Sequence, residues 1–77
     1  MISKEIAIHR LENYNQPIYA FSVEDLKEAI DYLRSIKNEL RQTNQLFLLD
    51  LANKVEQWLN SSYKGIEFKF VRNNLEE

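Results

Sequence analysis

Four large apolar residues follow one another at Leu46, Phe47, Leu48 and Leu49, inside a segment with the periodicity of an amphipathic helix. Successive residues of a helix point in different directions around its axis, so a domain that buries one face leaves part of this run uncovered. The uncovered apolar side chains need a second surface to pack against, which in a soluble protein is usually a partner or another copy of the chain. The alternative is that loops of the same chain enclose the start of the helix on both sides.

The chain has 77 residues, which predicts a single domain over 1–77, with residues 73–77 as a frayed tail. A chain this short buries only about 60% of its unfolded surface, so association is a natural source of stability. It contains no cysteine, which excludes disulfides and thiolate metal sites and fits a reducing compartment. The longest apolar run is four residues, far below the ~20 that span a bilayer, and no secretory signal is visible. We therefore expect a cytoplasmic protein without a membrane partner.

The charge balance limits the classes of partner. The net charge of −2 argues against a general nucleic-acid binder and is too small for a DNA mimic. Hydrophobic residues make up 44% of the chain, which is ample for a folded domain. The single glycine excludes the usual phosphate-binding loops, and no motif indicates a cofactor or a small-molecule substrate.

Three segments favour strands. In residues 4–11, Ile6 and Ile8 would lie on one side of an extended chain, with Glu5 and His9 on the other. A helix is an open alternative, because Ala7, Leu11 and Tyr14 would share a helical face. An Asn-rich turn and a proline then lead into a short strand over 18–21. Residues 66–71 alternate most cleanly and give the most secure strand.

Two segments favour helices. Ser22 is a good N-cap, with Asp25 as an imperfect capping-box partner, and the helix it opens is expected to reach Gln42. Thr43 and Asn44 break that pattern and can cap a second helix over 44–60. The expected inward stripes consist of Leu26, Ala29, Ile30, Leu33, Ile36 and Leu40 in the first helix, and of Leu48, Leu51, Ala52, Val55 and Leu59 in the second.

The predicted element order is β-β-α-α-β. We expect an α+β fold in which a helical hairpin covers one face of a three-stranded, largely antiparallel sheet. The pattern leaves the strand order open.

Catalytic chemistry is not indicated. His9 is the only histidine, and we interpret it as a lone exposed residue, because a general base or a metal ligand needs partners at defined distances. The carboxylates of Glu24, Glu28 and Asp31 fall on the polar side of the first helix, where a solvated surface explains them better than a catalytic pair. The prediction is a protein that is not an enzyme and holds no metal or cofactor.

Lys27, Arg34 and Arg41 are spaced by seven residues and would form a basic stripe along the first helix. Such a stripe can follow a phosphate backbone, so a nucleic-acid-binding regulator is the alternative hypothesis. The simpler interpretation is that Lys27 and Arg34 form ion pairs with Asp31 on the helix surface.

The leading hypothesis is a small protein–protein interaction module: a homodimer, or an adaptor or inhibitor that binds another protein by steric contact. In composition the chain is similar to many phage- and plasmid-borne accessory proteins. Large apolar and aromatic residues favour recognition surfaces. The predicted interface consists of Leu46, Phe47, Leu49, Trp58 and Tyr32.

Overall fold

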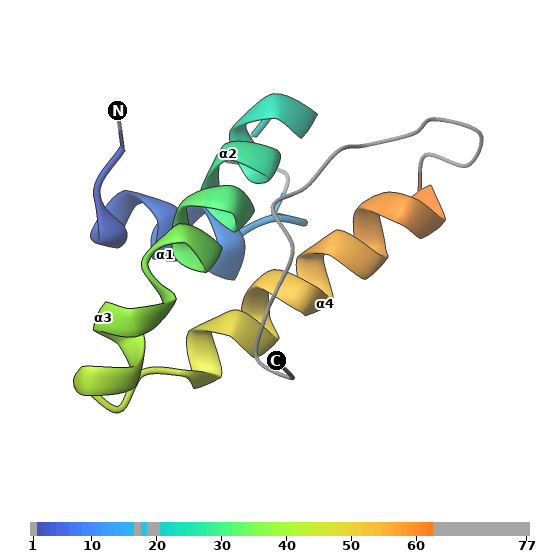
Figure 1. Cartoon of the computed structure of the whole chain (residues 1–77). Coiled ribbons are helices and arrows are strands. Elements are labelled where there is room, and N and C mark those ends of the chain that lie inside the picture. The colour runs from blue at the N-terminus through green and yellow to red at the C-terminus, as the bar shows by residue number, and fades with distance from the viewer. Residues whose placement is uncertain (1, 17, 19–20, 63–77) are drawn as a thin grey trace.

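The structure is a computed structural model that describes residues 2–16, 18 and 21–62. These residues form four helices, and Figure 1 shows how they are arranged. The helices are α1 (Lys4–Glu12), α2 (Val23–Ser35), α3 (Lys37–Gln42) and α4 (Phe47–Ser62).

The strand predicted over residues 4–11 is wrong, because this segment is the helix α1. Ser3 caps the helix, and its hydroxyl accepts a 3.2 Å hydrogen bond from the amide of Ile6. Ala7 and Leu11, one turn apart, are completely buried, whereas Ile6 is 47% exposed. Burial of Ala7 and Leu11, which are spaced by one helical turn, therefore determines the structure of this segment. The two-residue spacing of Ile6 and Ile8 does not.

The predicted α+β fold is also wrong, since the described part of the chain contains helices and no strand. Ile18 lies in a turn and is 82% exposed, and Phe21 lies outside any strand. The remainder of the predicted strand over 18–21, the strand over 66–71 and the tail over 73–77 lie outside the described residues. Once residues 4–11 are helical, the predicted hairpin loses its first strand.

The start of α2 confirms the predicted cap. The hydroxyl of Ser22 accepts a hydrogen bond from the amide of Asp25 at 3.1 Å, and the carboxylate of Asp25 accepts one from the amide of Ser22 at 3.3 Å. These two bonds form a capping box with Asp in place of the preferred Glu. The helix ends earlier than predicted, because Ile36 leaves helical geometry and separates α2 from α3.

Asn44 ends α3 instead of capping α4 as predicted. Its φ of 57° lies in the left-handed region, which Asn tolerates better than most residues. The amide of Gln45 donates to the carbonyl of Leu40 at 2.7 Å, and the amide of Asn44 donates to that of Arg41 at 3.3 Å. This is a Schellman motif, and it turns the chain so that α4 begins only at Phe47.

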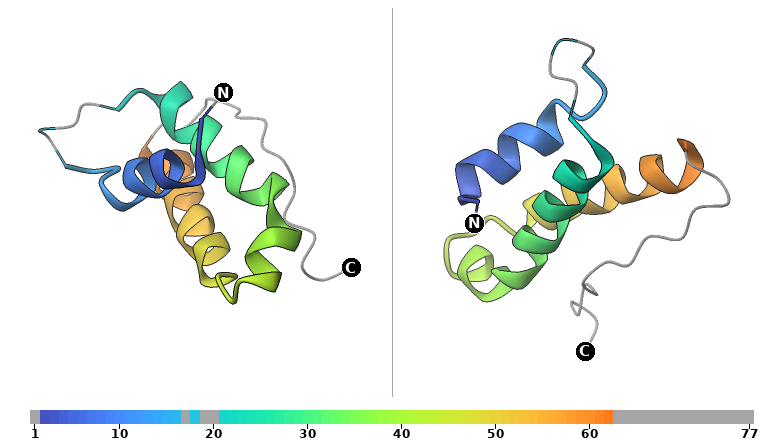
Figure 2. Two further views of the ribbon diagram at one scale, coloured as in Figure 1. Left: turned by 90° about the vertical axis from the view of Figure 1, so that its left-hand side faces the viewer. Right: turned by 90° about the horizontal axis from the view of Figure 1, so that it is seen from above.

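The helix α2 packs against both α1 and α4, while α1 and α4 contact each other less. Figure 2 shows the three helices crossing one another, with α3 at one end. The side chain of Lys4 fastens the start of α1 to the α3–α4 connection, because its ammonium donates to Gln45 at 2.9 Å and lies 3.6 Å from the carboxylate of Glu39. The core consists of Ala7, Leu11, Leu26, Ala29, Ile30, Leu33, Leu40, Leu48, Leu49, Ala52, Val55 and Leu59.

Within the described part of the chain, no helix has both the length and the apolar character needed to cross a membrane.

Leu49 and Leu46 provide a matched test of this packing. Leu49 is fully buried, whereas Leu46 precedes α4 and is only partly buried. Replacing Leu49 with Ala should lower the free energy of unfolding by about 2–5 kcal/mol, because it leaves a cavity in the core. Leu46→Ala should cost about 1 kcal/mol or less. Urea unfolding followed by circular dichroism measures both, and equal losses would contradict the burial of Leu49.

Candidate protein-binding surface

One flank of α4 carries apolar side chains outside the core. Phe47 is 61% exposed at the first position of the helix. Leu51 and Trp58 follow at four and eleven residues, which places all three on the same side of the helix, and both are partly buried. We call Phe47, Leu51 and Trp58 the α4 flank; the exposed residues Asp50 and Lys54 lie beside it.

Tyr14, which follows α1, extends this surface. Its ring packs edge-to-face on the indole of Trp58, with 5.0 Å between centroids and 69° between the planes. Both rings are partly buried against the core, so the position of Trp58 is fixed from one side. An aromatic residue held in this way can contact a partner at small conformational cost.

The structure separates the residues of the predicted interface. Phe47 and Trp58 share the α4 flank, and Leu46 precedes it as a partly buried neighbour. Leu49 lies inside the single chain. The apolar surface that remains at the start of α4 is therefore Phe47 with part of Leu46, which is smaller than the sequence suggested.

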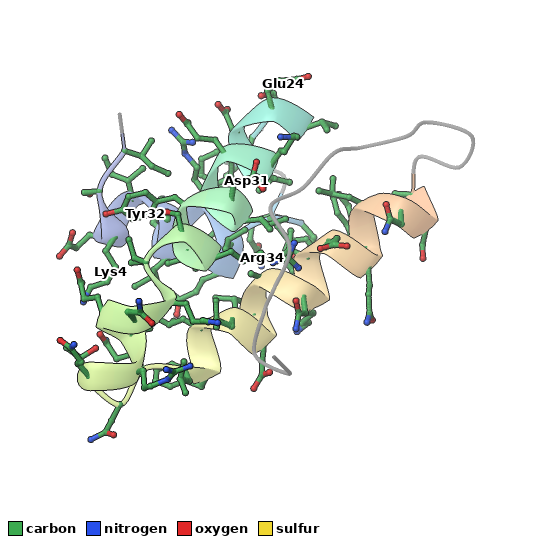
Figure 3. All side chains as sticks on the ribbon, viewed as in Figure 1. Lys4, Glu24, Asp31, Tyr32 and Arg34 are labelled. Carbon is green, nitrogen blue, oxygen red and sulfur yellow. The ribbon has the colours of Figure 1, made fainter. Side chains whose placement is uncertain are left out.

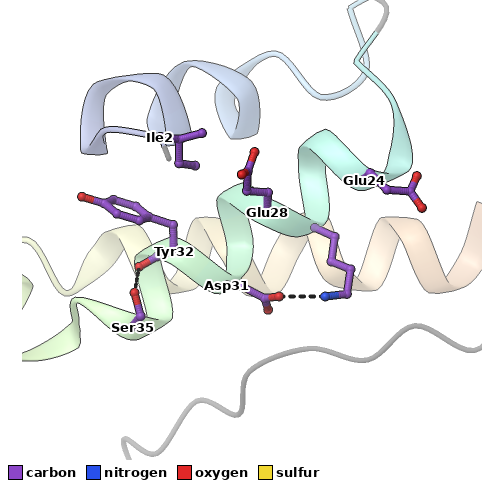
Figure 4. A pocket seen from close by; sticks show the side chains of 7 residues that line it. Ile2, Glu24, Glu28, Asp31, Tyr32 and Ser35 are labelled. Carbon is purple, nitrogen blue, oxygen red and sulfur yellow. Dashed lines mark hydrogen bonds and ion pairs between the residues drawn. The ribbon is translucent and has the colours of Figure 1, made fainter.

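Tyr32 lies on a different surface. It lines an open hollow of about 530 Å³ between the start of the chain and α2. Figure 4 shows Ile2 and Tyr32 at one end of this hollow and Glu24 at the other. Two of its carboxylates are engaged, since Arg10 donates to Glu28 at 2.8 Å and Lys27 donates to Asp31 at 2.8 Å. The residues that line the hollow are Ile2, Glu24, Lys27, Glu28, Asp31, Tyr32 and Ser35.

The opposite edge of α4 is held by Arg34 of α2, whose side chain is only 6% exposed. Its guanidinium donates to the amide oxygen of Asn53 at 2.7 Å and forms an ion pair with Glu56. Figure 3 shows Arg34 between the two helices. Leu49, Asn53 and Glu56 occupy successive turns on one edge of α4, so the polar contacts of Arg34 lie on the same edge as the buried Leu49.

The predicted basic stripe does not form a continuous surface. Lys27 pairs with Asp31 across one helical turn, as the simpler interpretation expects, but Arg34 turns inward to α4 instead of pairing with Asp31. Arg41 is exposed on α3, beyond the break at Ile36. The three cations thus lie in three different environments.

His9 is exposed on α1. Its ring packs edge-to-face on Phe21, with 5.9 Å between centroids, and the side-chain amide of Asn13 lies 3.4 Å from Nδ1. Among the described residues, no group of three or more His, Cys, Asp or Glu side chains could hold a metal ion.

Two features of α4 were not predicted from the sequence. Leu51 was placed in the inward stripe, although its spacing from Phe47 and Trp58 indicated the flank. The contact of Arg34 with Asn53 and Glu56 was also missed. The one available signal was the spacing of seven residues between Leu49 and Glu56, which places both on the same edge of the helix.

Comparison of the chain with protein-family models, curated proteins and solved structures finds no match.

Arg34 and Arg41 allow a buried arginine to be compared with an exposed one. Arg34→Ala should lower the free energy of unfolding by about 1–3 kcal/mol, because it removes packing between α2 and α4 and leaves Glu56 without its cation. Arg41→Ala should change it by about 0.5 kcal/mol or less. Thermal unfolding of both variants checks this, and an Arg34→Ala variant as stable as Arg41→Ala would refute the anchoring role.

Proposed function

We propose that this protein is a non-enzymatic protein-binding module that uses the α4 flank as its contact surface. The observation that carries the proposal is the exposure of Phe47, in line with Leu51 and Trp58. Large aromatic and aliphatic residues at such spacing are typical anchors of protein interfaces. The module acts by steric contact, as a self-associating protein or as an adaptor or inhibitor.

The surroundings of the flank support a protein partner over nucleic acid. Asp50 and Lys54 beside the flank carry opposite charges, so the surface has no excess of cations to contact phosphates. The basic residues of the alternative hypothesis are divided among a pair with Asp31, the α2–α4 contact and α3. No observation favours that second function.

We place this function in the cytoplasm. A reducing compartment is compatible with a chain that has no cysteine.

Photo-crosslinking in the producing cell tests the proposal. A benzophenone amino acid in place of Phe47 should give a covalent adduct with a protein, because this position lies in the contact surface. The matched control places the same group at Ile6, which is 47% exposed on α1 and lies outside the flank. Mass spectrometry of the adducts identifies the captured chain.

A protein adduct from position 47 and none from position 6 would support the binding module. Absence of an adduct at position 47, or the same adducts at both positions, would reject the α4 flank as the functional surface.

A further inference from the structure

We infer that the occupant of the α4 flank is the same flank of a second copy, with the two α4 helices antiparallel across a two-fold axis. This inference rests on the proposed function and names its partner. Its basis is that the flank is complementary to itself in shape and in charge, as a two-fold interface requires.

The apolar residues match when α4 is paired with a reversed copy. Phe47 and Trp58 are eleven residues apart, which is about 16 Å along a helix. If the axis passes near Ala52 and Asn53, each Phe47 lies opposite Trp58 of the other copy. The two Leu51 side chains then meet near the axis, on one edge of the contact.

The charges match in the same register. Asp50 and Lys54 are both exposed and lie on the other edge of the flank. The pairing brings Asp50 within about 1.5 Å of the partner Lys54 along the helix direction, while the two Lys54 residues are about 4.5 Å apart along it. Each interface therefore contains two Asp50–Lys54 pairs, and attraction outweighs the repulsion between lysines.

The size of the chain supplies a second reason for self-association. At 77 residues its own core is small, and Phe47 is a large side chain that is 61% exposed in the described part of the chain. Pairing the flanks covers both Phe47 rings with apolar surface and removes them from solvent.

Charge reversal with mixing tests this arrangement. In a dimer of the Asp50→Lys variant, both pairs between position 50 of one copy and position 54 of the other contain two lysines. In a dimer of the Lys54→Asp variant, both pairs contain two aspartates. Each variant alone should dimerise about tenfold more weakly than the parent, measured by analytical ultracentrifugation at low salt. When the two variants are mixed, every cross-chain pair is again opposite in charge, and heterodimers should form with an affinity near that of the parent.

Mixing isolates the contact between chains. Lys at position 50 is unfavourable in the first turn of α4, and pairs within one helix also change, but both effects are the same before and after mixing. Circular dichroism of each variant confirms that it is folded, and native mass spectrometry with one chain isotope-labelled counts the heterodimers.

Phe47→Ala provides a second variant without a charge change. It should weaken the dimer by about tenfold or more, because the aromatic contact with Trp58 is lost at both ends of the interface. The matched control Ile6→Ala removes apolar surface that is exposed elsewhere and should leave the dimer unchanged.

A parent protein that stays monomeric at about 1 mM would overturn the inference, as would a mixture that associates no better than its separate variants. Failure of this inference can be distinguished from failure of the proposed function. A crosslink from position 47 to a different protein, together with a monomeric parent, would retain the binding module and reject the second copy as its partner.

Discussion

The orientation of α4 about its own axis depends on its contact with α2. Leu49 is buried completely, and one and two turns further along the same edge Asn53 and Glu56 hold the guanidinium of Arg34. Apolar burial supplies the driving force for this contact, while the directional bonds of Arg34 fix which edge of α4 faces α2. With that edge turned inward, Phe47 lies on the opposite edge and remains exposed. The proposed binding surface is thus a consequence of the packing that stabilises the fold.

The connection between α3 and α4 allows α4 to adopt this orientation. The Schellman motif around Asn44 closes α3, and Lys4 holds Gln45 and Glu39 from the start of α1. Because α4 begins at Phe47, Leu46 lies before the helix and packs in part against the core. A helix starting at Asn44 would have put Leu46 on the polar side of α4, together with Asn53 and Gln57. The position of one cap therefore changes which apolar residues are available to a partner.

Much of the α2–α4 pairing could be predicted from the sequence, because long amphipathic stripes and a strong cap such as Ser22 leave little freedom. The structure of segment 4–11 could not be predicted, since Ile6 and Ile8 fit a strand while Ala7 and Leu11 fit a helix. Only packing against α2 decides between the two structures. The end of α2 at Ile36 and the inward turn of Arg34 also depend on contacts between distant residues. The flank of α4 was predictable in part: Phe47 and Trp58 were identified, but Leu49 was assigned to the surface because its burial in the core was not visible in the local pattern.

The division of α4 into a buried edge and an exposed flank is tested most directly by solvent paramagnetic relaxation, with a soluble gadolinium chelate and protein dilute enough to be monomeric. The ring protons of Phe47 should relax strongly, and the methyl protons of Leu49 should be almost unaffected. Comparable relaxation of Phe47 and Leu49 would show that α4 is not oriented as described, and both the core and the proposed binding surface would have to be reassigned.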